Sequence, residues 1–272
     1  TTPRRRDAGM AKADLRAEMP SILVPAEGGR VNDRPVIAFT VCDRPAYLAW
    51  VLESWREVRG IAAAHLIFRC APGCDEAVDL CRAVDFAETT VTINPQRYGV
   101  LGNPWHALND GFAVSDFVVL AEEDLIVSED VLEYFAWCRA RYADDPRVLA
   151  ITTHQYLEQP GGLAGVMPQR FDQDPDPHFW VWATWRNWWE AFIRDTWDFT
   201  YRAAGWDWAL LNGWIHGRGM RLMAPCLSRS QHVGRLGGKH CTPDQYETMR
   251  SRCFVSSVPP QEYADVPVRL SA

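Results

Sequence analysis

The sequence has almost no lysine, no long apolar run and no paired cysteine motif, and each of these absences excludes something. Only Lys12 and Lys239 are lysines, so arginine supplies nearly all of the positive charge. This bias is typical of a GC-rich genome and indicates a bacterial or phage origin. No stretch reaches the roughly 20 apolar residues that a membrane-spanning helix requires. The 8 cysteines are scattered without the spacing of a zinc site, which favours reduced thiols.

Two further absences bear on location and partners. Residues 1–16 are charged and lack the apolar stretch of a signal peptide, so we expect an intracellular, cytoplasmic protein. The formal net charge is −7, whereas non-specific binding of nucleic acid usually requires a basic face. A nucleic acid therefore enters our predictions only as a candidate substrate and not as a non-specific partner.

Strand-like and helical patterns alternate after an N-terminal arm, residues 1–34. Short apolar runs predict four strands, and each is followed by a helical pattern. The strands are Val36–Cys42, His65–Phe68, Thr90–Ile93 and Phe117–Ala121, and the helices begin near Pro45, Asp75, Asn103 and Ser128. This order predicts an α/β fold with a mostly parallel sheet, in which ligands bind beyond the carboxyl ends of the strands.

The second half of the chain has a different composition. We divide the chain into residues 35–145, a nucleotide-binding half, residues 146–256, an acceptor-binding half, and a tail from 257 to 272. Most of the 13 tryptophans fall in the acceptor-binding half. Indole rings stack on the apolar faces of sugars, but they also fill cores; for Trp180–Trp189 the core interpretation is favoured.

Three carboxylates, Glu122, Glu123 and Asp124, directly follow the fourth strand. Like charges packed together are unfavourable unless a cation or several hydrogen-bond donors offset them. Mg²⁺ or Mn²⁺, which prefer oxygen ligands and also bind phosphates, would do so. The alternative is an exposed acidic turn that caps the next helix.

Four segments resemble glycosyltransferase family 13, the inverting N-acetylglucosaminyltransferases. They are residues 42–44 (CDR), residues 122–135 (EEDLIVSEDVLEYF), residues 206–208 (WDW) and residues 225–237 (PCLSRSQHVGRLG), in the order and spacing of that family. The resemblance covers roughly residues 35–249 and implies a GT-A fold that binds a nucleoside diphosphate sugar. The sequence departs from the family at Glu123, where the family has Asp, and at residues 68–71, where the family has a base-reading Asp.

The resemblance also implies roles for the residues of the nucleotide-binding half. Asp124 aligns with the residue that binds the metal, Mn²⁺ or Mg²⁺. Glu122 and Glu123 then fall on positions that contact the donor sugar nucleotide, a UDP-sugar. Asp43 and Arg44 are expected beside its base or diphosphate, with a surface ion pair between them as the alternative.

Residues 228–240 combine glycines with basic side chains, which predicts a flexible loop that closes over the diphosphate. Arg229, Arg235 and His240 are its candidate ligands for the nucleotide sugar. A solvated basic loop is the alternative.

Inversion at the anomeric carbon requires a carboxylate that removes the proton of the acceptor hydroxyl. Asp207 is our candidate because it lies between Trp206 and Trp208, where partial desolvation would raise its pKa. Asp198 and Asp195 are the next candidates, and an Asp near a helix start is the non-catalytic alternative.

The sequence thus predicts an inverting, metal-dependent glycosyltransferase with an unidentified hydroxyl acceptor. A sugar-phosphate nucleotidyltransferase would share the fold and the metal, but residues 42–46 lack the Gly-rich phosphate loop of such enzymes. A catalytically silent carbohydrate-binding protein on the same scaffold is the second alternative.

Overall fold

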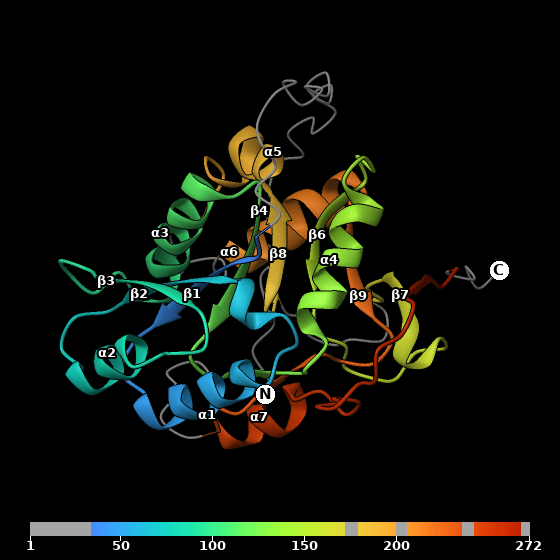
Figure 1. Ribbon diagram of the computed structural model, residues 1–272. Helices are drawn as coiled ribbons and strands as arrows, with labels where there is room; N and C mark the ends of the chain where they lie inside the picture. The colour runs from blue at the N-terminus through green and yellow to red at the C-terminus, as the bar shows by residue number, and fades with distance from the viewer. Residues whose placement is uncertain (1–33, 172–178, 200–205, 236–241, 268–272) are drawn as a thin grey trace, which may run out of the picture.

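The computed structural model describes residues 34–171, 179–199, 206–235 and 242–267. Within them, a mixed sheet with the strand order β11-β7-β9-β6-β8-β4-β1-β2-β3 forms the centre of the molecule (Figure 1). Its strands are β1 (Val36–Val41), β2 (His65–Cys70), β3 (Glu88–Ile93), β4 (Phe117–Glu122), β6 (Val148–Thr152), β7 (Gly165–Pro168), β8 (Trp182–Trp185), β9 (Arg221–Pro225) and β11 (Ala264–Asp265). A small second sheet pairs β5 (Leu125–Val127) with β10 (Ser230–His232).

Helices cover both faces of the large sheet (Figure 1). They are α1 (Pro45–Arg56), α2 (Asp75–Arg82), α3 (Gly99–Val114), α4 (Val131–Tyr142), α5 (Arg186–Trp188), α6 (Trp206–Ala209) and α7 (Pro243–Met249). Wider π-helical turns extend α5 over Trp189–Ile193 and α6 over Leu210–His216, and 3₁₀ turns span Ile61–Ala63 and Gly162–Ala164.

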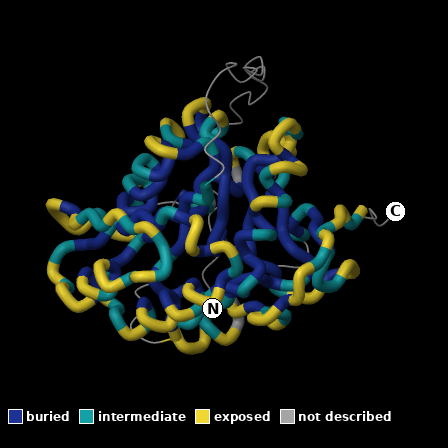
Figure 2. Tube along the Cα trace, in the orientation of Figure 1, coloured by how far each residue is buried: buried dark blue, intermediate teal, exposed yellow. Residues whose placement is uncertain are grey.

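The strands expected in residues 35–145 do form a run of parallel strands. β1 lies between β2 and β4 and is parallel to both, and β3 is parallel to β2. The carboxyl ends of β1, β2 and β4 therefore meet at one edge of the sheet. Of these strands β1, β2 and β4 are buried, whereas β3 at the edge of the sheet is half-buried to exposed; Figure 2 shows exposed residues on the outer elements.

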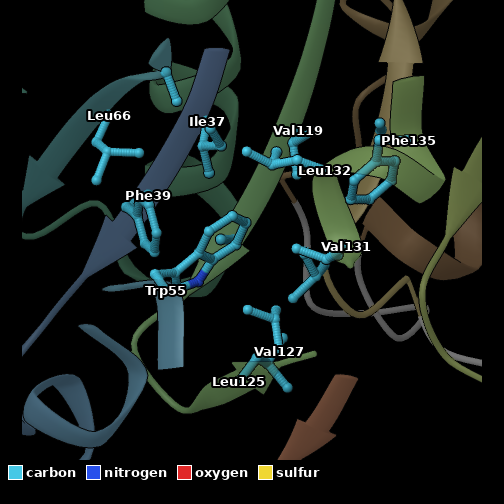
Figure 3. Packing of buried hydrophobic residues seen from close by; sticks show 14 of the residues in the cluster. Ile37, Phe39, Trp55, Leu66, Val119, Leu125, Val127, Val131, Leu132 and Phe135 are labelled. Atoms are coloured by element: carbon cyan, nitrogen blue, oxygen red, sulfur yellow. The ribbon is translucent and has the colours of Figure 1, made fainter. Parts of the chain in front are cut away.

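Alternating residues of the strands build two cores, one on each face. In β1, Phe39 packs with α1, α2 and α4, where it meets Trp55 at 5.5 Å between ring centroids (Figure 3). Ala38 instead faces α3, α6 and the π-helical turns. This alternation is the two-residue period of a strand covered on both sides.

The aromatic residues of the second half are mainly core, as favoured from the sequence. Trp206 stacks against Trp197 at 4.7 Å and against Trp182 at 5.5 Å, and all three are buried. These three stacked rings pack between β8 and α6. Trp50, at 61% exposed, is the exception among the described tryptophans.

Two predicted helix starts were wrong. α3 begins at Gly99, so Pro104 lies inside it. Because proline has no N–H, the carbonyl of Val100, four residues earlier, lacks its helical hydrogen bond. Val100 is exposed, so water can satisfy that carbonyl. The Asn103 amide does not cap the helix but donates to the carbonyl of Arg69, 3.1 Å away. α4 begins at Val131 rather than after Ser128, whose hydroxyl donates to Asp130 at 2.6 Å.

No helix in the described parts of the chain is both long and apolar enough to cross a lipid bilayer.

Candidate functional site

The acidic triplet lies where the sheet topology predicts, at the carboxyl edge. Glu122 is the last residue of β4 and pairs in register with Thr40 of β1, so the segment after β1 runs beside the triplet. The backbone N–H of Cys42 donates to Glu123 Oε2 at 2.6 Å. The two motifs recognised separately in the sequence, residues 42–44 and 122–124, thus form one site.

Arg44 bridges two of the three carboxylates. Its Nε donates to Glu123 Oε1 at 2.8 Å and its terminal nitrogen donates to Asp124 Oδ2 at 2.6 Å. Both carboxylates are buried. Burial opposes the charge on the guanidinium, but Asp124 and Glu123 outweigh this and raise the pKa of Arg44 above its usual value. Arg44 therefore supplies the positive charge that the triplet needs in the metal-free protein.

His232 is the site residue that sequence reasoning missed. Its Nε2 lies 3.1 Å from Asp124 Oδ2, because β10 pairs with β5 and places His232 opposite Leu125, the residue after the triplet. The Val233 N–H also donates to the carbonyl of Asp124 at 2.8 Å. Burial would raise the pKa of Asp124, but His232 and Arg44 outweigh it, so the pKa lies below its usual value.

The second oxygen of Asp124 makes the site suitable for a cation. Asp124 Oδ1 is buried and has no hydrogen-bond partner among the described residues. Buried carboxylate oxygens are rarely left in this state, and a bound ion is one of the ways in which proteins satisfy them. A carboxylate and an imidazole are both ligands that Mn²⁺ accepts, so Asp124 and His232 fit the predicted metal.

A second grouping of potential ligands lies beside it. Ligand atoms of Cys42, Asp43 and Glu123 lie within 4.8 Å of one another. Burial, with the charges of Asp43 and Glu123, raises the pKa of the Cys42 thiol to about 11, which keeps it protonated. Asp43 is bound to Arg97 at 2.7 Å. A protonated thiol is a poor ligand for Mg²⁺ or Mn²⁺, so this grouping fits the metal less well.

Asp207 lies near enough to the triplet to act on it electrostatically. Burial raises the pKa of Glu122 to about 8, and the negative charges of Asp124 and Asp207 add to the rise while Arg44 opposes it. Asp207 occupies the first turn of α6 and is half-buried, next to the buried Trp206. The charge of Asp207 thus contributes to the raised pKa of Glu122.

The basic residues of the predicted lid are placed differently. Arg229 is fully buried, its Nε donates to Asp130 Oδ2 at 2.8 Å, and its other nitrogens donate to the carbonyls of Leu227 and Leu163. All its donor nitrogens face protein acceptors, so its predicted contact with a nucleotide sugar is replaced by a structural role. Arg235 is exposed and lies 3.8 Å from Glu247.

The flexible loop predicted for residues 228–240 is corrected in its first part. Ser228 and Ser230 are fully buried, and residues 230–232 form β10. The glycines suggested a loop, but Gly234 is buried against Asp124. His240 lies outside the described residues.

The sequence matches no known family model, and it matches no curated protein. Solved structures do resemble the fold. S. aureus TarS residues 1–349 in complex with UDP-GlcNAc has a TM-score of 0.55 at 12% identity, covering 79% of this chain and 64% of that one. The mannosyltransferase PcManGT from Pyrobaculum calidifontis, in complex with GDP-Man and Mn²⁺, has a TM-score of 0.50 at 16% identity, covering 71% and 55%.

These likenesses establish the architecture. The chain has the predicted α/β fold of the GT-A kind, with a large, mostly parallel sheet that it shares with solved glycosyltransferases. It spans less than two thirds of the length of either of them.

Proposed function

We propose that the protein is a glycosyltransferase that moves a sugar from a nucleoside diphosphate to an acceptor hydroxyl, with inversion at the anomeric carbon. The observation that carries the proposal is the convergence of Arg44, Asp124 and His232 at the carboxyl edge of the sheet. In α/β sheets of this topology that edge binds ligands. The likeness of the fold to structures in complex with nucleotide sugars supports it.

Asp124 and His232 would hold Mn²⁺ or Mg²⁺ in this proposal. When bound, the ion neutralises the negative charge that develops on the departing diphosphate. Within the Asp124 carboxylate, Oδ1 is the oxygen left to bind it, because Arg44 and His232 both lie on Oδ2; the imidazole of His232 would be the second protein ligand. Few protein ligands are sufficient, since Mg²⁺-like ions are commonly held by one or two carboxylates together with phosphates and water.

The nucleotide would lie over the carboxyl ends of β1 and β2. Asp43 and Arg97 form an ion pair of 2.7 Å there, and both side chains are close to half exposed. Together they offer one acceptor and several donors, which suits the edge of a nucleobase or the ribose hydroxyls. Arg44 remains available to the diphosphate through its positive charge.

Asp207 would accept the proton of the acceptor hydroxyl. It is half-buried and close enough to Glu122 to contribute to the raised pKa of that carboxyl, which supports a role for Asp207 beside the donor sugar. In this proposal Glu122 and Glu123 accept hydrogen bonds from ribose or sugar hydroxyls. The resemblance to family 13 favours UDP-N-acetylglucosamine as the first donor to try, and the acceptor is a hydroxyl compound.

The test measures binding and slow hydrolysis of UDP-GlcNAc, UDP-glucose and GDP-mannose by the full chain, with Mn²⁺ and with EDTA. We expect one donor to bind and hydrolyse in Mn²⁺ and to lose most of its affinity in EDTA. Binding without hydrolysis or transfer would indicate a silent carbohydrate-binding protein. Formation of a nucleotide sugar from a nucleoside triphosphate and a sugar 1-phosphate would indicate a nucleotidyltransferase.

A further inference from the structure

Trp180 lies against the imidazole of His232. The two rings are stacked, with centroids 5.2 Å apart and planes 27° from parallel. Trp180 is buried, at 8% exposed, so its indole is largely closed to a sugar. It also contacts the ring of His154, at 4.5 Å between centroids. The indole thus forms a wall that limits rotation of the His232 ring about its terminal side-chain bond, a torsion that is otherwise broad.

The backbone at Val181 departs from the line of β8, which begins at Trp182. If the strand continued regularly back to residue 180, Trp180 and Trp182 would share a face, yet Trp180 belongs to the core with α1 and α4, and Trp182 belongs to the opposite core. The break falls at Val181, whose φ is 39° and which is the one non-glycine residue with a positive φ in the described ranges. This conformation is rare for a β-branched residue and costs about 1–3 kcal/mol.

A threonine holds the break in place and ties it to the strand of His232. The Thr153 hydroxyl lies 2.8 Å from the carbonyl of Trp180 and 2.7 Å from the hydroxyl of Ser230. It can donate to the first and accept from the second. Ser230 is in β10, two residues before His232. Trp180 and β10 are therefore joined twice, once by the ring stack and once through Thr153.

We infer that Trp180, which the backbone at Val181 directs away from the line of β8, is a positioning residue that fixes the His232 ring so that Nε2 faces Asp124. Backbone strain in native proteins is concentrated at functional sites and persists only where the surroundings enforce it. Residues that orient a ligating histidine also contribute strongly to metal affinity, although they do not touch the metal. The metal-binding consequence rests on the proposed function, whereas the orientation of His232 is a property of the metal-free protein.

The experiment compares Trp180→Leu, Trp180→Phe and the matched control Trp185→Leu. Trp185 is equally buried, at 8% exposed, and lies in the same strand region, where it packs on Phe117 at 5.2 Å instead of on His232. Trp180→Leu and Trp185→Leu both remove a buried indole, so general loss of packing affects both. Trp180→Phe keeps an aromatic face and serves as the rescue variant.

The first measurement is made on metal-free protein by NMR, with His232→Gln identifying the His232 ring signals. Stacking on Trp180 shifts those signals upfield; we expect Trp180→Leu to abolish the shift, Trp180→Phe to retain part of it and Trp185→Leu to keep it. The second is the affinity for Mn²⁺ with UDP, which we expect to fall about 10- to 100-fold in Trp180→Leu and little in the other two.

Unchanged His232 signals in folded Trp180→Leu would overturn the inference whether or not the protein binds nucleotides. Equal loss of Mn²⁺ affinity in Trp180→Leu and Trp185→Leu would show that Trp180 contributes only to core packing and would overturn its positioning role. A protein that binds no nucleotide in any form would contradict the proposed function, while the NMR result would still decide the positioning role.

Discussion

Gly234 lies directly against the carboxylate of Asp124. A β-carbon at position 234 would stand 2.5 Å from Asp124 Oδ2, 3.0 Å from His232 Cε1 and 3.1 Å from Arg44 Nη1. The first separation is shorter than any van der Waals contact between such atoms. A glycine is therefore required here by the close approach of the backbone to the site, and not by its backbone conformation, since its φ is not in the left-handed region.

The first prediction is that Gly234→Ala disrupts the site selectively. The added methyl group must displace the Asp124 carboxylate or the backbone after β10, so affinity for UDP with Mn²⁺ should fall at least about 10-fold. Gly213→Ala is the matched control, because a methyl group added there would meet nothing within 4 Å. Calorimetry of binding and a thermal melt of both variants check this; normal binding by Gly234→Ala would show that Asp124 is not part of the site.

The second prediction concerns metal dependence. Asp124→Asn removes the charge that Arg44 and His232 face and the candidate metal-binding oxygen, so the difference in UDP affinity between Mn²⁺ and EDTA should largely disappear. Asp116→Asn is the control, since Asp116 pairs with Arg186 at 2.6 Å just before the opposite end of β4. It should keep the full difference. A parent protein that binds UDP equally well in EDTA would remove the metal from the proposal.

The third prediction separates chemistry from binding at Asp207. Asp207→Asn keeps the shape of the side chain but cannot accept a proton, so the transfer rate should fall by roughly 10² to 10⁴ while donor affinity stays within a few-fold. Asp79→Asn, on an exposed side chain paired with Arg82 in α2, is the control and should leave both unchanged. Weak donor binding with a normal turnover would make Asp207 a structural residue, and Asp198 would be the next residue to change.

The fourth prediction tests the revised role of Arg229. Arg229→Met leaves the fully buried Asp130 without its ion-pair partner, which should reduce the free energy of unfolding by about 3–5 kcal/mol. Nucleotide affinity of the folded fraction should not change. Arg235→Met is the comparison, because Arg235 is exposed and should contribute less than about 1 kcal/mol. Urea titrations of both variants measure these losses in the free energy of unfolding. Greater destabilisation by Arg235→Met than by Arg229→Met would contradict the prediction.

The sequence was informative where local pattern decides structure. The short apolar runs of β1, β2 and β4 are long enough to identify buried strands, and the helices between the strands follow from apolar spacing. The triplet could be placed at the sheet edge because the topology of parallel strand–helix units leaves few alternatives.

His232 could not be found in this way. Its strand has three residues, and its partner strand, Leu125–Val127, is equally short. Three residues are too few to show the alternation of apolar and polar residues that identifies a strand, and the glycines that follow favoured a loop. Arg229 was misassigned for a related reason: its partner Asp130 is distant in the chain, and nothing local distinguishes a buried arginine from a solvated one. The resemblance identified the segment but not the residue that contacts Asp124.

The pairing of β5 with β10 also sets an order for assembly. The triplet and β10 are separated by about a hundred residues, so the triplet leaves the ribosome well before its imidazole partner does. Until His232 has been synthesised, Arg44, which precedes the triplet in the chain, is the residue that neutralises Glu123 and Asp124. A nascent chain halted before residue 230 would therefore contain the parallel strands β1 to β4 but not a complete site. Nucleotide binding should appear only when β10 has been synthesised and has paired with β5.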